Sequence, residues 1–118
     1  MTAQDTSSFA GMHALIGQLP AASRGAMLRM YRKSLDDHLE QVAAALQPGG
    51  ESGVLLAAVH RIAGAAGMMQ DQALSQVARD MEVALREGRP ADARALWPGL
   101  QARAEATRSE LDIIAPAA

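Results

Sequence analysis

Residues 53–69 read GVLLAAVHRIAGAAGMM, and the spacing of their apolar side chains predicts a helix that packs inside a helical bundle. Apolar residues recur at steps of four, three, four and three, which is the narrow seam that a helix turns toward a bundle core. The seam consists of Leu55, Val59, Ile62, Ala66 and Met69. His60 follows a seam position by one residue, and one residue turns an α-helix by about 100°. We therefore expect His60 beside the seam, outside the core.

Similar apolar stripes on both sides of this segment predict three more long helices and one short helix. They cover residues 9–19, residues 23–46, a segment that follows Asp71 and ends near Gly88, and a segment from Pro90 to about Ile114. Asp71 is a suitable N-cap for its helix. Pro98 interrupts the last stripe, and we expect it to kink or split that helix.

Four long amphipathic segments with short connections favour an antiparallel four-helix bundle, with the short additional helix at its N-terminal side. The chain has 118 residues, so we expect one domain over 1–118. Residues 1–8 are polar and small and are expected to form a loose terminus. Aromatic residues make up only 3% of the chain, which also favours an all-α class over a β-rich one.

Charge and composition exclude several classes of function. The net charge of −2 argues against a nucleic-acid-binding domain, which is usually basic. No apolar run approaches the roughly 18 residues of a membrane span, and the first residues lack the pattern of a signal peptide. The absence of cysteine excludes disulfides, Cys-ligated zinc and thiol catalysis. We expect a cytoplasmic protein that contacts neither nucleic acid nor membrane.

The second half of the quoted stretch is unusually poor in side-chain bulk. Gly64 and Gly67 together cost about 2 kcal/mol in helix propensity. One interpretation is close packing between helices, where small residues let backbones approach. The other is access to His60, because a nucleophile surrounded by small residues can be reached by the reactive centre of another protein. The residues alone leave both interpretations open.

The stretch and its continuation resemble the histidine-containing phosphotransfer (HPt) domain family. That family has a histidine followed by small residues and glycine, then a leucine, a small residue and a hydrophobic-Glu pair. The matching residues here are His60, Ile62, Gly64, Ala65, Ala66, Met69, Leu74, Ala78, Met81 and Glu82. The expected layout, with a short helix before four bundle helices and the histidine on the second of these four, is also that of the family.

The resemblance implies that His60 is a phosphoacceptor, which carries a phosphoryl group on Nε2 and exchanges it with the aspartate of a receiver domain. An imidazole is largely unprotonated near pH 7 and is then a nucleophile. The resemblance also implies that Glu82 accepts a hydrogen bond from His60 Nδ1–H and so fixes the tautomer. Without the resemblance, Glu82 would be interpreted as an ordinary solvated glutamate.

The sequence departs from the family at two positions near the histidine. The family usually has a lysine three residues after it, where this chain has Ala63, and a glycine ten residues after it, where this chain has Gln70. Arg79 and Arg61 are candidates for the missing phosphate-side cation, although each taken singly is typical of a solvated surface charge. Gln70 is expected to mark a local change of the backbone near the helix end.

The expected partners are response-regulator receiver domains, and a hybrid sensor kinase that contains this chain as a module is a further candidate. The candidate docking residues are Leu56, Ala57, Ala63, Gly64, Gly67 and Met68. We expect a monomer without kinase activity and without a cofactor of its own, since Mg²⁺ would belong to the receiver domain. His13 and His38 are interpreted as packing residues, and no metal site is expected. Two alternatives remain: an HPt-like adaptor that binds receivers without being phosphorylated, and a purely structural bundle.

Overall fold

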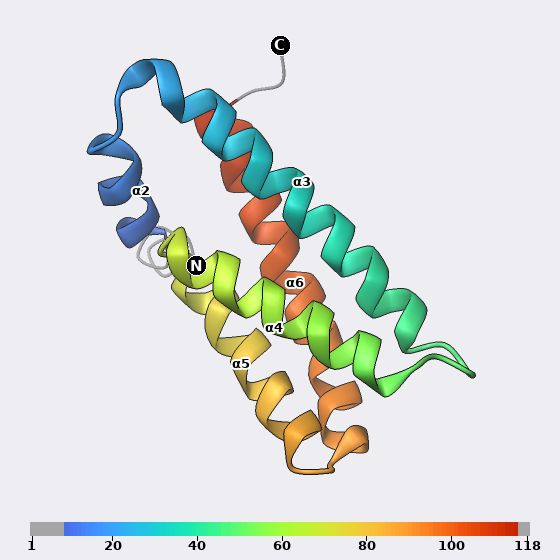
Figure 1. The fold of residues 1–118 in the computed structure, drawn as a ribbon. Helices are drawn as coiled ribbons and strands as arrows, with labels where there is room; N and C mark the ends of the chain where they lie inside the picture. Colours follow the sequence, from blue (N-terminus) through green and yellow to red (C-terminus); the bar gives the residue numbers. More distant parts are fainter. Residues whose placement is uncertain (1–8, 116–118) are drawn as a thin grey trace.

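The computed structural model describes residues 9–115, and within them the secondary structure is entirely helical (Figure 1). The helices are α2 (Ala10–Gly17), α3 (Ala21–Ala45), α4 (Ser52–Met68), α5 (Gln72–Arg86) and α6 (Pro90–Ile114). Every helix begins and ends within two residues of the bounds that the sequence predicts. The expected loose terminus, residues 1–8, lies outside the described residues.

Helices α3 to α6 form the expected antiparallel four-helix bundle (Figure 1). Each of these helices packs against the next one in the chain, and α6 also contacts α3. The seam of α4 is buried in the core, where Val59 and Ala66 are completely covered. The amphipathic pattern explains this arrangement, because only a bundle removes one apolar stripe per helix from water.

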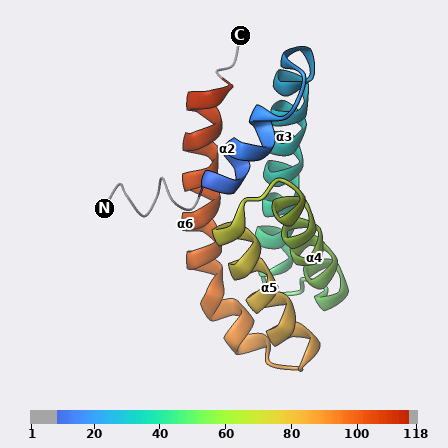
Figure 2. The same ribbon diagram turned by 90° about the vertical axis from the view of Figure 1, so that its left-hand side faces the viewer.

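The short helix α2 lies across one end of the bundle, in front of α3 and α6 (Figure 2). Its anchors are Phe9 and Met12, which are buried in a small cluster with Leu28, Tyr31 and Leu111. Since this cluster joins residues of α2, α3 and α6, it closes the end of the bundle that the four long helices leave open.

Helix α6 passes through Pro98 without a break, so the expectation of a split helix is wrong. Figure 2 shows the helix curving through its first half, which agrees with the milder expectation of a kink. Pro98 is exposed, while Ala93 and Leu100 on either side are completely buried. Packing therefore holds both halves of the helix in place.

Asp71 occupies the predicted N-cap position of α5, but its side chain does not cap the helix. It is buried instead, and its Oδ2 accepts hydrogen bonds from the hydroxyls of Tyr31 and Thr107, each at 2.6 Å. The capping expectation for the side chain is therefore wrong, because partners on α3 and α6 outcompete the local backbone. Burial raises the pKa of Asp71, and the two hydrogen bonds offset this only in part.

The turn between α4 and α5 depends on an unusual conformation of Gln70. Its φ is +60°, in the left-handed region that glycine adopts most readily. The N–H of Asp71 bonds to the carbonyl of Ala66, and the N–H of Gln70 bonds to the carbonyl of Gly67. These two bonds form a Schellman motif. Glutamine thus adopts the conformation that suits a glycine, and a change of backbone relative to the family stays a prediction.

Candidate functional site

His60 lies near the middle of α4 on the outer face of the bundle, as the spacing predicts. Its side chain is 63% exposed. Neighbouring seam residues Val59 and Ile62 turn inward and are buried. A rotation of about 100° per residue therefore puts the imidazole in solvent while its helix stays anchored in the core.

Glu82 on α5 holds one nitrogen of this ring. The distance from His60 Nδ1 to Glu82 Oε2 is 2.8 Å, so the hydrogen bond that the resemblance implies is present. An ionised carboxylate can only accept, and the proton therefore lies on Nδ1. In the neutral ring this leaves the lone pair of Nε2 free for a nucleophilic attack.

Arg86 holds Glu82 from the other side. Its Nε and Nη2 lie 3.0 and 2.7 Å from the same Oε2 that accepts from His60. Partial burial raises the pKa of Glu82, but the hydrogen bonds from Arg86 and His60 outweigh it and bring the pKa below its ordinary value. The side chain of Glu82 is only 14% exposed. The site thus contains a fixed, ionised acceptor beneath an accessible imidazole.

The comparisons with known proteins agree with this geometry. The family model for the Hpt domain matches residues 26–110, which is well over half of the chain. The chain belongs to the Hpt domain family. The family is associated with histidine phosphotransfer in phosphorelays. Neither the search of curated proteins nor that of solved structures found a match.

The matched residues of this Hpt domain include the four long helices almost completely, but not α2. Helix α2 (Ala10–Gly17) therefore lies outside the matched residues. Gly11 of α2 lies directly against the turn at Gln70, where an added Cβ would come within 3.2 Å of the Gln70 Cβ.

Most of the docking candidates share the outer side of α4 with His60. Gly64 and Met68 are exposed, and Leu56, Ala57 and Gly67 are half-buried. A Cβ built on Gly64 would have no neighbouring atom within 4 Å. Space is therefore open one helical turn from His60, which favours access over close helix packing at this glycine.

Ala63 does not belong to that surface, and its prediction as a docking residue is wrong. It is 3% exposed, and its carbonyl accepts a hydrogen bond from the Ser75 hydroxyl of α5 at 3.1 Å. Three residues after His60 the helix has turned by about 300°, which brings Ala63 back toward the packed side.

The two predicted cations differ in their surroundings. A Cβ on Gly67 would meet a guanidinium nitrogen of Arg79 at 3.2 Å, so Arg79 reaches across from α5 and lies over Gly67. Gly67 follows His60 by seven residues, or about 10 Å along the helix axis. Arg61 is exposed beside His60.

Sequence reasoning did not assign Arg86 to the site. The signal for it was the spacing of four residues between Glu82 and Arg86, which puts an acid and a base on the same helix face. That spacing is common on solvated surfaces, and only the contact of Glu82 with His60 gives it a functional meaning.

The other two histidines have separate surroundings. His13 Nε2 donates to Glu110 Oε2 at 2.5 Å and so links α2 to α6. His38 is half-buried on α3 and is hydrogen-bonded to Ser34 at 3.3 Å. In the described part of the chain, no three His, Cys, Asp or Glu side chains gather as a metal-binding group would require.

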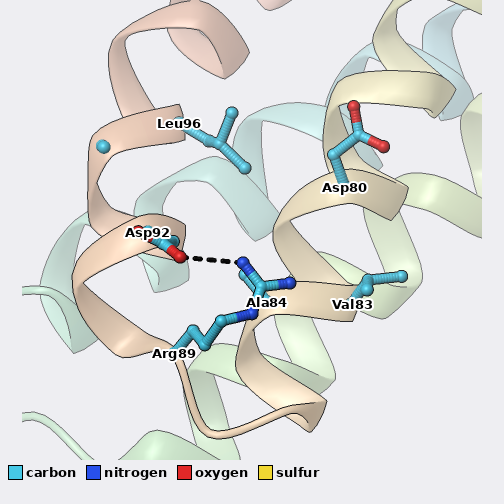
Figure 3. Close-up of a pocket in the computed structure, with 7 residues that line it drawn as sticks. Asp80, Val83, Ala84, Arg89, Asp92 and Leu96 are labelled. Carbon is cyan, nitrogen blue, oxygen red and sulfur yellow. Dashed lines mark hydrogen bonds and ion pairs between the residues drawn. The ribbon is translucent and has the colours of Figure 1, made fainter.

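A hollow of about 430 Å³ lies elsewhere on the surface, between α5 and α6. Arg89 crosses it and donates to Asp92 at 2.8 Å, and Asp80 and Leu96 form part of its wall (Figure 3). Arg89 also donates to Glu87. Since its charge is already paired within the protein, this hollow adds nothing to the site at His60.

None of the helices in residues 9–115 combines the length and the apolar character that crossing a membrane requires.

Proposed function

We propose that this chain accepts a phosphoryl group on Nε2 of His60 from the aspartyl phosphate of a receiver domain and passes it to the aspartate of another. The observation that carries this proposal is the contact of 2.8 Å between His60 Nδ1 and Glu82 Oε2 on an exposed ring. Membership of the Hpt domain family supports the same reaction and the same class of partner.

In the proposed step, the Nε2 lone pair attacks the phosphorus of the aspartyl phosphate. The N–P bond forms while the P–O bond to the aspartate breaks, and the aspartate carboxylate leaves with the bonding electrons. The ring keeps its proton on Nδ1 and gains positive charge. Glu82, whose pKa lies below its ordinary value, is ionised beside that proton and stabilises the charge. The reverse step delivers the phosphoryl group to the next receiver.

Arg86 supports this step as a positioning residue, since it contacts Glu82 and not the ring. Two donors from one guanidinium converge on the Oε2 atom that accepts from His60, so they help to hold this oxygen in place beside the ring. Arg61 and Arg79 stay candidates for screening the phosphoryl charge. We expect the receiver to bring the Mg²⁺ that neutralises the transferred group.

A phosphotransfer assay tests the proposal. The chain is incubated with a radiolabelled, phosphorylated receiver domain, and labelled protein is separated and tested for stability in acid and base. We expect a label that is lost in acid and kept in base, as a phosphoramidate would be. The label should be absent from His60→Gln and unchanged in His38→Gln. Equal labelling of wild type and His60→Gln would overturn the proposal.

The alternative function is an adaptor that binds receivers without being phosphorylated, and Ala63 is the observation that favours it. This position lacks the family's lysine, and it is also packed against α5. Binding of a receiver without transfer of the label would support the adaptor. A cytoplasmic location, a monomeric state and membership of a larger sensor kinase remain predictions.

A further inference from the structure

The methionines of this protein fall into two groups. Within residues 9–115, three of them are buried in the core, namely Met12, Met69 and Met81. The other three are among the exposed large hydrophobic residues, namely Met27, Met30 and Met68. Met30 is 72% and Met68 80% exposed. Such exposure is unusual for side chains that proteins mostly use to fill their cores.

The exposed methionines come together in one groove. It has a volume of about 240 Å³ and lies between α3 and α4. Its walls contain no charged side chain and consist of Met27, Met30, Tyr31, Ser34, Ala65, Met68 and Met69. Thioether side chains are flexible and polarisable, which suits them to an adaptable apolar contact.

The groove is continuous with the surface around His60. His60, Gly64 and Met68 follow one another at steps of four residues along α4. Four residues turn the helix by about 40° more than a full turn, so this row winds from His60 toward α3. A receiver domain that reaches His60 across the open surface at Gly64 would therefore cover Met68 next.

We propose that oxidation of Met27, Met30 and Met68 by a peroxide prevents docking of the receiver domain, which covers the groove between α3 and α4 when it reaches His60. The proposal rests on the proposed function, since it names the regulation of the same site. The receiver is the occupant because the groove continues the surface that leads to the reacting nitrogen.

The chemistry needs a peroxide as the only co-reactant. The thioether sulfur attacks one peroxide oxygen, an S–O bond forms, and the O–O bond breaks with release of water or an alcohol. The sulfur loses two electrons and the peroxide gains them. The product is a methionine sulfoxide, which is polar where the thioether was apolar, and methionine sulfoxide reductases reverse the change.

The burial pattern makes this modification selective. Met12 and Met81 are completely buried and Met69 is only 7% exposed, so the fold shields these three side chains from peroxide far more than the exposed ones. Oxidation of Met27, Met30 and Met68 alters exposed side chains, and the core stays as it is. Docking should therefore weaken while the bundle remains folded.

The test compares wild type with the triple variant Met27→Leu, Met30→Leu, Met68→Leu, which keeps apolar side chains of similar volume but cannot form sulfoxides in the groove. Each full-length protein is treated with hydrogen peroxide, and its oxidised residues are identified by peptide mass spectrometry. Phosphotransfer from a phosphorylated receiver domain, and binding of the same receiver by calorimetry, are measured before and after treatment. Each protein's own untreated values are its reference, and Met1 is present in both.

We expect transfer and affinity to fall at least tenfold in peroxide-treated wild type, with an unchanged helical circular dichroism spectrum. The triple variant should keep its own untreated values, and a methionine sulfoxide reductase should restore the wild type. Undiminished transfer and binding by wild type that carries all three sulfoxides would overturn the proposal, as would an equal loss in the triple variant. If the untreated chain binds the receiver without transfer, the proposed function fails. The effect of oxidation on docking is then judged from the binding affinities alone.

Discussion

Gly64 is the position where one substitution separates docking from folding. It lies one turn after His60, about 6 Å along the axis of α4, and a Cβ at this position meets nothing within 4 Å. A leucine side chain therefore fits without disturbing the bundle. It would stand in the space that a receiver must enter to bring its phosphoryl group to His60. We predict that Gly64→Leu impairs phosphotransfer while the protein becomes more stable.

The two effects have opposite signs and can be estimated separately. Leucine is favoured over glycine in a helix interior by about 0.8 kcal/mol, which for a chain of 118 residues raises Tm by about 3 °C. A misplacement of about 1 Å in a reacting pair can cost roughly a hundredfold in rate. We therefore expect kcat/KM for transfer to fall by about ten- to a hundredfold. Gly64→Ala adds only a methyl group and should have a much smaller effect on transfer.

Transfer is measured from a phosphorylated receiver domain, and stability by thermal unfolding followed by circular dichroism. Gly99→Leu is the matched control, because Gly99 lies inside α6 and a Cβ at this position also meets nothing within 4 Å. It should show a similar gain in Tm with no loss of transfer. A Gly64→Leu protein that transfers at the wild-type rate would refute the idea that receivers approach across this surface.

Three further predictions follow from side chains around the site and its supporting turn. Glu82→Ala should slow transfer about tenfold or more, because Nδ1–H of His60 loses its acceptor. Glu82→Gln keeps an acceptor oxygen and should slow transfer less. Equal rates for wild type and both variants in the same assay would contradict the orienting role of Glu82. The raised pKa of Asp71 means that the folded state binds its proton more tightly than the unfolded state, so its contribution to stability falls as pH rises from the ordinary aspartate range through the folded pKa. Urea unfolding of wild type and Asp71→Asn across that range measures this effect. The difference in unfolding free energy between the two proteins should shift in favour of the variant as pH rises. A difference that does not depend on pH would contradict the role given to Asp71. Gln70→Gly should raise the unfolding free energy by up to about 1 kcal/mol, since the left-handed φ of +60° suits glycine, whereas a loss of stability would argue that the Gln70 side chain holds the turn.

Local patterns account for most of what the sequence could predict. The steps between Leu55, Val59 and Ile62 were enough to place α4 and to turn His60 outward, because helical geometry fixes the direction of each side chain relative to its neighbours. The same arithmetic puts Ala63 about 60° from His60, and only its packing against α5 in the structure shows that it is buried.

Contacts between helices were beyond the reach of these patterns. Asp71 has the residue type and position of a cap, but its actual partners, Tyr31 and Thr107, are 40 and 36 residues away in the chain. No pattern in the sequence around Asp71 predicts that hydroxyls so distant in the chain will bond to its carboxylate. The contact between His60 and Glu82 was predictable only through the family resemblance, because 22 residues and a turn separate them.

The central claim is that Nε2 of His60 carries the phosphoryl group while Nδ1 keeps its proton for Glu82. Long-range ¹H–¹⁵N NMR spectra of the ¹⁵N-labelled chain, recorded before and after phosphorylation by a receiver domain, distinguish the two ring nitrogens. We predict an Nδ1–H tautomer in the free protein and an N–P bond at Nε2 of His60 after transfer. Phosphorylation at Nδ1, or at His13 or His38 in place of His60, would contradict the account.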